Sequence, residues 1–157
     1  MTHAAATDSS TTLGQLCQLT TVVADTGDLS AIAQFRPVDA TTNPSLITAA
    51  ASLPENVHLI EAAYEQARQE GLSGEPLLNR SIDILTVKLG IEILKLIDGR
   101  VSTEVDPNFS FNTEATIQRG LELVKLYQQA GISTDRILIK IAATWQGIQA
   151  AKFLEQQ

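Results

Sequence analysis

A single lysine within an apolar, β-branched segment is the residue of this sequence best suited to chemistry. The segment reads ILIKIAA over residues 137–143, and Lys140 lies at its centre. An ammonium group among apolar side chains must be paired with an anion, lose its proton, or serve a reaction. A desolvated lysine with a lowered pKa is a nucleophile for carbonyl carbons and forms a Schiff base with them. Lys140 is therefore the first candidate for a catalytic residue.

Three other short apolar segments each carry one polar residue near their carboxyl end. These residues are Asp25, Asn43 and Glu104. Carboxylates beside a Schiff-base lysine can move protons to and from hydroxyls and the carbinolamine. An asparagine can hold a substrate hydroxyl or carbonyl oxygen. Together with Lys140, these residues favour cleavage of a carbon–carbon bond next to a ketone, with the lysine iminium as the electron sink.

Each candidate residue also has a purely structural explanation. Lys140 and Glu104 could form a structural ion pair, and buried pairs of this kind often contribute little net stability. Asp25 taken alone is typical of a loop or helix cap, and the TNP of residues 42–44 is typical of a turn before a helix. The reaction is favoured only because the residues lie at the same level of four successive strands.

Short strands and helices alternate along the predicted fold. Strands are expected over residues 20–25, 38–43, 100–106 and 136–144. Helices are expected over residues 13–19, 26–35, most of 45–98, 112–131 and 145–157. Four strand–helix units in succession are typical of βαβ connections and a parallel sheet, so the fold class is α/β. Active sites of parallel α/β sheets and barrels lie at the carboxyl ends of the strands, where the candidates are.

The long helical region before the third strand gives three further expectations. Its apolar residues recur with helical spacing and predict one apolar helix face, formed by Ile82, Leu85, Leu89, Ile93 and Leu96. Gly99 stands where a left-handed residue would end this helix. Pro44 suits the first turn of the helix that follows the second strand.

The composition is that of a globular protein, with 44% hydrophobic and 18% charged residues among 157. A formal charge of −7 argues against a nucleic-acid partner, which would require a basic face. The apolar runs fall short of the roughly 20 residues of a membrane span, so no membrane partner is expected. Residues 1–12 resemble no signal peptide and predict a disordered tail.

The cysteine and histidine content points to a cytoplasmic protein without a metal site. Cys17 is a single cysteine and suits a reducing compartment. His3 and His58 are far from each other and from Cys17 in the sequence, so the spacing of metal ligands is missing.

The candidate residues lie in segments that resemble the transaldolase family. Residues 38–47, VDATTNPSLI, resemble the first signature of that family. Residues 137–151, ILIKIAATWQGIQAA, resemble the second signature, which contains the Schiff-base lysine. The segments VVADTGD (22–28) and GRVSTEVDP (99–107) resemble the family around the first and third strands. The resemblance extends from about Leu13 to the end of the sequence.

The resemblance implies a (β/α)₈ TIM barrel of the class I aldolase type. Its reaction moves a dihydroxyacetone unit from a ketose phosphate to an aldose phosphate in the non-oxidative pentose phosphate pathway. The usual substrates are sedoheptulose 7-phosphate and glyceraldehyde 3-phosphate, which give erythrose 4-phosphate and fructose 6-phosphate. No metal or organic cofactor is implied, because the iminium itself withdraws the electrons.

The resemblance also implies a role for each candidate residue. Lys140 would be the Schiff-base nucleophile, and Glu104 would handle protons through a water during carbinolamine formation and dehydration. Asp25 would take the proton from the C4 hydroxyl during cleavage. Asn43 would hold the dihydroxyacetone unit, with Thr42 beside it as a second substrate-binding residue.

The resemblance covers about half of such a barrel, since a complete one takes about 250 residues. Residues 13–157 are therefore expected to form the N-terminal half of a catalytic barrel, truncated after the fourth strand–helix unit. The second half of the family supplies the residues that grip the substrate phosphate. No arginine of this sequence is expected near the predicted site; the six are Arg36, Arg68, Arg80, Arg100, Arg119 and Arg136.

A half barrel would leave the edges of its first and fourth strands unpaired, and such edges invite association. A homodimer would cover them. Two other functions stay open from the sequence. One is a related Schiff-base aldolase that releases dihydroxyacetone, and the other is a non-catalytic barrel fragment that acts only in assembly.

Overall fold

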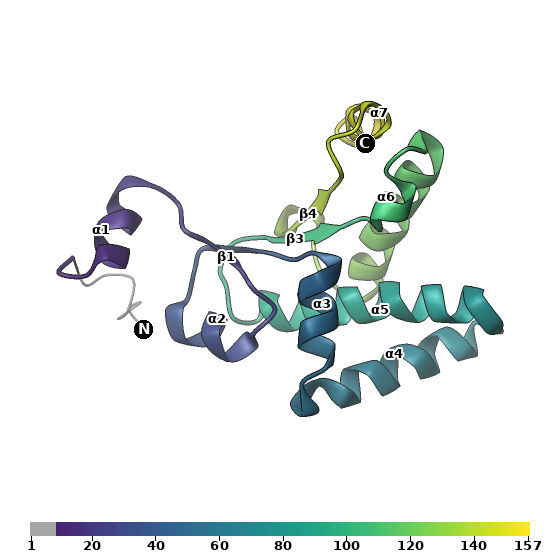
Figure 1. The fold of residues 1–157 in the computed structure, drawn as a ribbon, viewed down its shortest axis with the longest axis horizontal. Helices are drawn as coiled ribbons and strands as arrows, with labels where there is room; N and C mark the ends of the chain where they lie inside the picture. Colours follow the sequence, from purple (N-terminus) through teal and green to yellow (C-terminus); the bar gives the residue numbers. More distant parts are fainter. Residues whose placement is uncertain (1–8) are drawn as a thin grey trace.

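A parallel sheet of four strands lies at the centre of the structure, as Figure 1 shows. The computed structural model describes residues 9–157. The strands are β1 (Val23–Asp25), β2 (Asp39–Thr41), β3 (Val101–Glu104) and β4 (Ile137–Lys140). They pair in the order β1-β2-β3-β4, and every pairing is parallel. The predicted α/β class and parallel sheet are confirmed, although each strand is shorter than its predicted segment.

Helices connect the strands, and the connection from β2 to β3 holds three of them. The α-helices are α1 (Thr12–Leu19), α2 (Leu29–Phe35), α3 (Pro44–Ala51), α4 (Val57–Gln69), α5 (Gly74–Leu94), α6 (Thr113–Gln129) and α7 (Trp145–Leu154). Short 3₁₀ turns are η1 (Pro54–Asn56), η2 (Pro107–Phe109) and η3 (Thr134–Arg136). Within residues 9–157 no helix is both long and apolar enough to cross a membrane. Of the predicted tail, residues 1–8 lie outside the described part of the chain.

Local capping chemistry explains where the helices begin. The Asp28 carboxylate accepts hydrogen bonds from the backbone N–H groups of Ser30 and Ala31 at 2.9 and 3.1 Å, which fixes the start of α2. Asn43 caps α3 in the same way, and Pro44 occupies the first helical position, as predicted. These caps set the angle at which each chain segment leaves the sheet, and therefore the position of the strand ends.

The core lies between one face of the sheet and helices α5 and α6. Val101, Thr103 and Val105 alternate along β3 and are all buried on this face. The Thr103 hydroxyl is hydrogen-bonded to the Tyr127 hydroxyl of α6 at 2.7 Å, inside the core. The opposite face of β4 is open, since Leu138 is 42% exposed. One face of the sheet is thus packed, and the other is available for a site.

The region before β3 departs from the prediction at two positions. Of the predicted apolar face, Leu89 and Ile93 are buried, but Ile82 is exposed. Ile82 lines an open cleft between α3 and α5 instead of packing in the core. Gly99 does not have a left-handed backbone, and α5 already ends at Leu94. The glycine is needed because a Cβ there would collide with the Asp39 carboxylate, which accepts a hydrogen bond from the next backbone N–H.

The two outer strands of the sheet have pairing partners on one side only within residues 9–157. β1 pairs with β2, and β4 pairs with β3. Their other edges carry backbone groups of the kind that neighbouring strands pair with. A homodimer joined at these edges stays a prediction.

Candidate active site

The strand register places the catalytic candidates on the open face of the sheet. Glu104 of β3 and Lys140 of β4 are direct register partners, and so are Thr41 of β2 and Ser102 of β3. Partners on adjacent parallel strands point to the same side, and side chains alternate along each strand. Asn43, two residues after Thr41, therefore comes level with Glu104 and Lys140. Thr41 belongs to the same face as Asn43 by the alternation of side chains.

Lys140 and Glu104 form an ion pair at the carboxyl ends of their strands. The Nζ atom of Lys140 lies 3.1 Å from Oε2 of Glu104 and donates a hydrogen bond to the carbonyl oxygen of Thr42 at 3.2 Å. The side chains are 37% and 17% exposed, respectively. The expectation that apolar groups surround Lys140 is wrong, because only one face of β4 is packed. The lysine is held by an anion and a carbonyl oxygen and is still reachable from solvent.

The two predicted substrate-binding residues lie next to this pair but present different groups to it. The Thr42 side chain is buried, and its hydroxyl donates to the Ser102 carbonyl at 3.0 Å. Thr42 therefore meets Lys140 through its backbone carbonyl. The Asn43 Oδ1 atom accepts a hydrogen bond from the Leu46 N–H at 3.0 Å, which caps α3. The NH₂ group of Asn43 is the part that could hold a substrate oxygen.

Asp25 lies farther from the lysine than the other candidates. It ends β1, is paired in register with Thr41, and belongs to the same open face. In the sheet order two strands separate it from β4. The side chain is exposed and lies at a mostly apolar groove of about 350 Å³ between α1, α2 and the sheet. The described residues thus bring Glu104 directly to Lys140 but leave Asp25 at the far side of the face.

Two hydrogen bonds join the segments that follow the strands of Glu104 and Lys140. The Thr144 hydroxyl, which also caps α7, donates to the carbonyl of Ser110 in the loop after β3. The hydroxyl of Thr113, the first residue of α6, donates to the carbonyl of Gln146 in the first turn of α7 at 3.1 Å. The segments after β3 and β4 are therefore bonded to each other, which restricts relative movement of the two strands.

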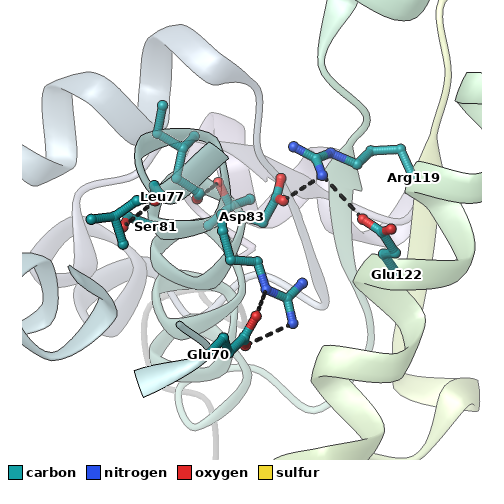
Figure 2. Close-up of polar contacts among 9 residues, drawn as sticks. Glu70, Leu77, Ser81, Asp83, Arg119 and Glu122 are labelled. Atoms are coloured by element: carbon teal, nitrogen blue, oxygen red, sulfur yellow. Dashed lines mark hydrogen bonds and ion pairs between the residues drawn. The ribbon is translucent and has the colours of Figure 1, made fainter. Parts of the chain in front are cut away.

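The structure adds a second charged pair that the sequence analysis missed. Asp83 of α5 and Arg119 of α6 point toward one another, and Arg119 also reaches Glu122 (Figure 2). The Arg119 Nη1 atom lies 2.8 Å from Asp83 Oδ2 and 3.0 Å from Glu122 Oε2. Asp83 and Arg119 line a cleft of about 680 Å³ that Glu104 and Asn43 also line. The expectation that every arginine lies away from the site is wrong for Arg119, whose partner comes from a different helix.

Burial dominates the electrostatics of Asp83. Desolvation raises the pKa of its carboxyl from the ordinary 3.8 to about 6, and Arg119 opposes this rise without reversing it. Glu122 and Asp106 add like-charge repulsion, which favours the protonated acid, whereas Arg80 favours the carboxylate. The folded protein therefore holds a proton on Asp83 more tightly than the unfolded chain does.

This shift predicts that the free energy of unfolding falls as the pH rises from about 4 to about 6. Below this range the acid is protonated in both states, and above it both states are ionised, so the loss becomes constant at about 3 kcal/mol. Urea unfolding should show this loss in the native protein and not in Asp83→Asn. The exposed Glu61→Gln should keep the native pH profile, and a profile of Asp83→Asn equal to the native one would refute the assignment.

Among residues 9–157, no three or more histidine, cysteine, aspartate or glutamate side chains lie together in an arrangement that could hold a metal ion.

Comparison with known proteins gives a consistent set of relatives. Residues 22–157 match the family model described as transaldolase/fructose-6-phosphate aldolase. The chain is 52% identical over 148 residues to a transaldolase of Methylococcus capsulatus and 56% identical over 145 residues to a human transaldolase. It is 53% identical over 138 residues to a transaldolase of Saccharomyces cerevisiae. These alignments cover 88–92% of the chain but only 41–45% of each relative, so the chain spans less than half their length.

Proposed function

The chain belongs to the transaldolase/fructose-6-phosphate aldolase family, and on that basis we propose that it carries the Schiff-base lysine of a transaldolase active site. The observation that carries the proposal is the Lys140–Glu104 pair, 3.1 Å apart at matched register on the open face of the sheet. A purely structural ion pair does not require an open face of the sheet beside it. A lysine that attacks a sugar carbonyl requires one, because the substrate must reach its amine.

The proposed fold is a (β/α)₈ barrel, of which these residues form the first half. Four parallel strands in sequential order, with their polar groups at the carboxyl ends, are what the first half of a (β/α)₈ barrel would contain. The edges of β1 and β4 that have no pairing partner within residues 9–157 are the places where further strands would join. In such a barrel the open face that carries Lys140 would be the interior.

The proposed reaction begins with Lys140. Its neutral amine attacks the C2 carbonyl of fructose 6-phosphate and forms a carbinolamine, which loses water to give the iminium. Glu104 lies close enough to move the protons of these steps, directly or through one water. The carbonyl of Thr42 orients the amine through its 3.2 Å hydrogen bond, and Asn43 holds an oxygen of the dihydroxyacetone unit.

Cleavage follows from the iminium. Asp25 takes the proton of the C4 hydroxyl, the C3–C4 bond breaks, and glyceraldehyde 3-phosphate leaves. The electron pair of the broken bond passes to the iminium, which becomes an enamine on Lys140. The enamine then attacks the aldehyde of erythrose 4-phosphate, and hydrolysis releases sedoheptulose 7-phosphate. The reverse direction uses the same steps, and the proposal places them in the cytoplasmic pentose phosphate pathway.

The release of glyceraldehyde 3-phosphate from fructose 6-phosphate alone tests this proposal. Without an acceptor, a transaldolase keeps the dihydroxyacetone unit on the lysine, so product release should stop after one equivalent per Lys140. Addition of erythrose 4-phosphate should restart it. Continuous release of dihydroxyacetone would instead identify an aldolase.

Two variants make the result specific. Lys140→Ala should release nothing, whereas Lys152→Ala, which removes an exposed lysine of α7, should behave as the native protein does. If the folded native chain releases no glyceraldehyde 3-phosphate, the proposed activity does not belong to these residues alone.

A further inference from the structure

A row of polar side chains crosses the open face of the sheet, on the amino-terminal side of the Lys140–Glu104 pair. Asp25 of β1 is paired in register with Thr41 of β2, and Thr41 is paired with Ser102 of β3. Side chains on one face recur at every second residue, so this row lies two residues before Glu104 along β3. The proposed mechanism gives Asp25 a role and leaves the two hydroxyl groups of the row unassigned.

Hydroxyl groups on the two faces of these strands differ in their hydrogen bonding. On the packed face, the Thr42 hydroxyl donates to the Ser102 carbonyl at 3.0 Å. The Thr103 hydroxyl, on the same face, is bonded to the Tyr127 hydroxyl at 2.7 Å. On the open face, the hydroxyls of Thr41 and Ser102 have no hydrogen-bond partner within residues 9–157, and both side chains are partly exposed. These two hydroxyls are therefore available to a molecule that enters the open face.

The amine of Lys140 lies near these hydroxyls, because the side chain does not stay over its own strand. Its Nζ atom donates to the carbonyl of Thr42 at 3.2 Å, so the side chain reaches across β3 to the end of β2. Thr42 stands between Thr41 and Asn43, which both face the open side. A ketone carbon bonded to Nζ would therefore lie beside Thr41, on the strand between those of Asp25 and Ser102.

The chemistry of the row defines the ligand that fits it. A hydroxyl group both donates and accepts, so it binds an alcohol group without adding a charge. With the ketone carbon on Lys140, the hydroxyl groups of its two neighbouring carbons extend to either side, along the row. The row becomes apolar on β4, where Leu138 is the register partner of Ser102. The polar part of the face is thus confined to the three strands beneath and beside the amine.

We propose that the hydroxyl groups of Thr41 and Ser102 bind the hydroxyl groups of the dihydroxyacetone unit and select ketones that carry them. This role rests on the proposed function, because the ligand is held at the row through its bond to Lys140. It adds two substrate-binding residues to Asn43 and accounts for the polar character of the face under the amine.

Borohydride labelling of Lys140 by dihydroxyacetone and by acetone tests this role. Both ketones form an iminium: the amine nitrogen bonds to the carbonyl carbon, and the carbonyl oxygen leaves as water. Hydride from borohydride then adds to the iminium carbon and gives a stable secondary amine. Neither ketone has a phosphate group, and only dihydroxyacetone has hydroxyls. The measured quantity is the concentration of each ketone that gives half-maximal labelling of the Lys140 peptide by mass spectrometry.

Removal of either hydroxyl should affect one ketone and spare the other. Thr41→Val and Ser102→Ala should each raise the half-maximal concentration of dihydroxyacetone about fivefold, because one neutral hydrogen bond is lost. The half-maximal concentration of acetone should not change. Thr41→Ser keeps the hydroxyl group and should label with dihydroxyacetone as the native chain does.

Matched controls remove the same groups at the opposite end of the sheet. Ser133→Ala and Thr134→Val replace exposed residues just before β4 and should leave both concentrations unchanged. The exposed Lys152 of α7 provides the reference for labelling of an ordinary amine in the same samples. Labelling of Lys140 by acetone above this reference also shows that a variant is folded.

The possible contrary results have different meanings. Unchanged labelling by dihydroxyacetone in both variants would show that these hydroxyls bind only water. An equal loss with both ketones would show that they act on the lysine and not on the ligand. Either result would overturn the proposed selection and leave Lys140 as the Schiff-base residue. If neither ketone labels Lys140 above Lys152 in the native chain, the proposed function fails together with the selection.

Discussion

Replacement of Glu104 by glutamine should slow the first-turnover release of glyceraldehyde 3-phosphate from fructose 6-phosphate about 100-fold or more. Glutamine keeps the size of the side chain but can neither accept a proton nor attract the Lys140 ammonium 3.1 Å away. The carbinolamine steps then depend on water for their proton transfers. Rapid-quench measurement of the first turnover reports this rate directly.

The matched control removes a carboxylate that also pairs with a lysine. Glu92 of α5 lies 2.7 Å from Lys95, an exposed residue just after the end of that helix. Glu92→Gln should leave the first-turnover rate unchanged. If Glu104→Gln reacts within twofold of the native rate, Glu104 is only the structural partner of the lysine, and the proposed proton-transfer role is wrong.

Replacement of Gly90 by alanine should destabilise the fold by about 3 kcal/mol, through overpacking of the core. A Cβ on Gly90 would overlap the hydroxyl of Tyr127, which is fully buried and hydrogen-bonded to Thr103 at 2.7 Å. α5 and α6 cannot move apart to make room for the Cβ without opening the core between them and β3. Urea unfolding measures the loss as a lower midpoint with an unchanged slope.

A double-mutant cycle separates this overlap from a general intolerance of alanine at position 90. Tyr127→Phe alone should cost about 1–2 kcal/mol, because the Thr103 hydroxyl loses its partner. In the Gly90→Ala/Tyr127→Phe protein the colliding oxygen is gone, so the loss should be smaller than the sum of the single losses. Strict additivity would show that the Tyr127 hydroxyl is not what excludes a Cβ.

Local patterns in the sequence predicted the parts of the fold that short-range chemistry determines. The period of two along β3 and β4 places Glu104 and Lys140 on the same face, and the parallel register confirms it. The predicted position of Pro44 in the first turn of α3 follows from its fixed backbone angle and its missing N–H. Such features depend on residues a few positions apart, so the sequence alone is sufficient to find them.

Such patterns could not predict contacts between segments that are far apart in the sequence. Asp83 and Arg119 stand on different helices, and neither residue has a local signal that predicts the other. The guanidinium of Arg136, just before β4, donates to the carbonyls of Gly99 and Ile97 near the end of the α5 region, at 2.6 and 3.0 Å. The helical period of α5 could not show that Ile82 faces an open cleft rather than the core.

Borohydride reduction of the chain in fructose 6-phosphate, followed by peptide mass spectrometry, tests whether Lys140 forms the Schiff base. A reduced adduct is expected on the peptide that carries Lys140, retained in Lys152→Ala and absent in Lys140→Ala. An adduct on another lysine, or none in a sample whose amide spectrum shows the folded state, would contradict the assignment of Lys140 as the Schiff-base residue.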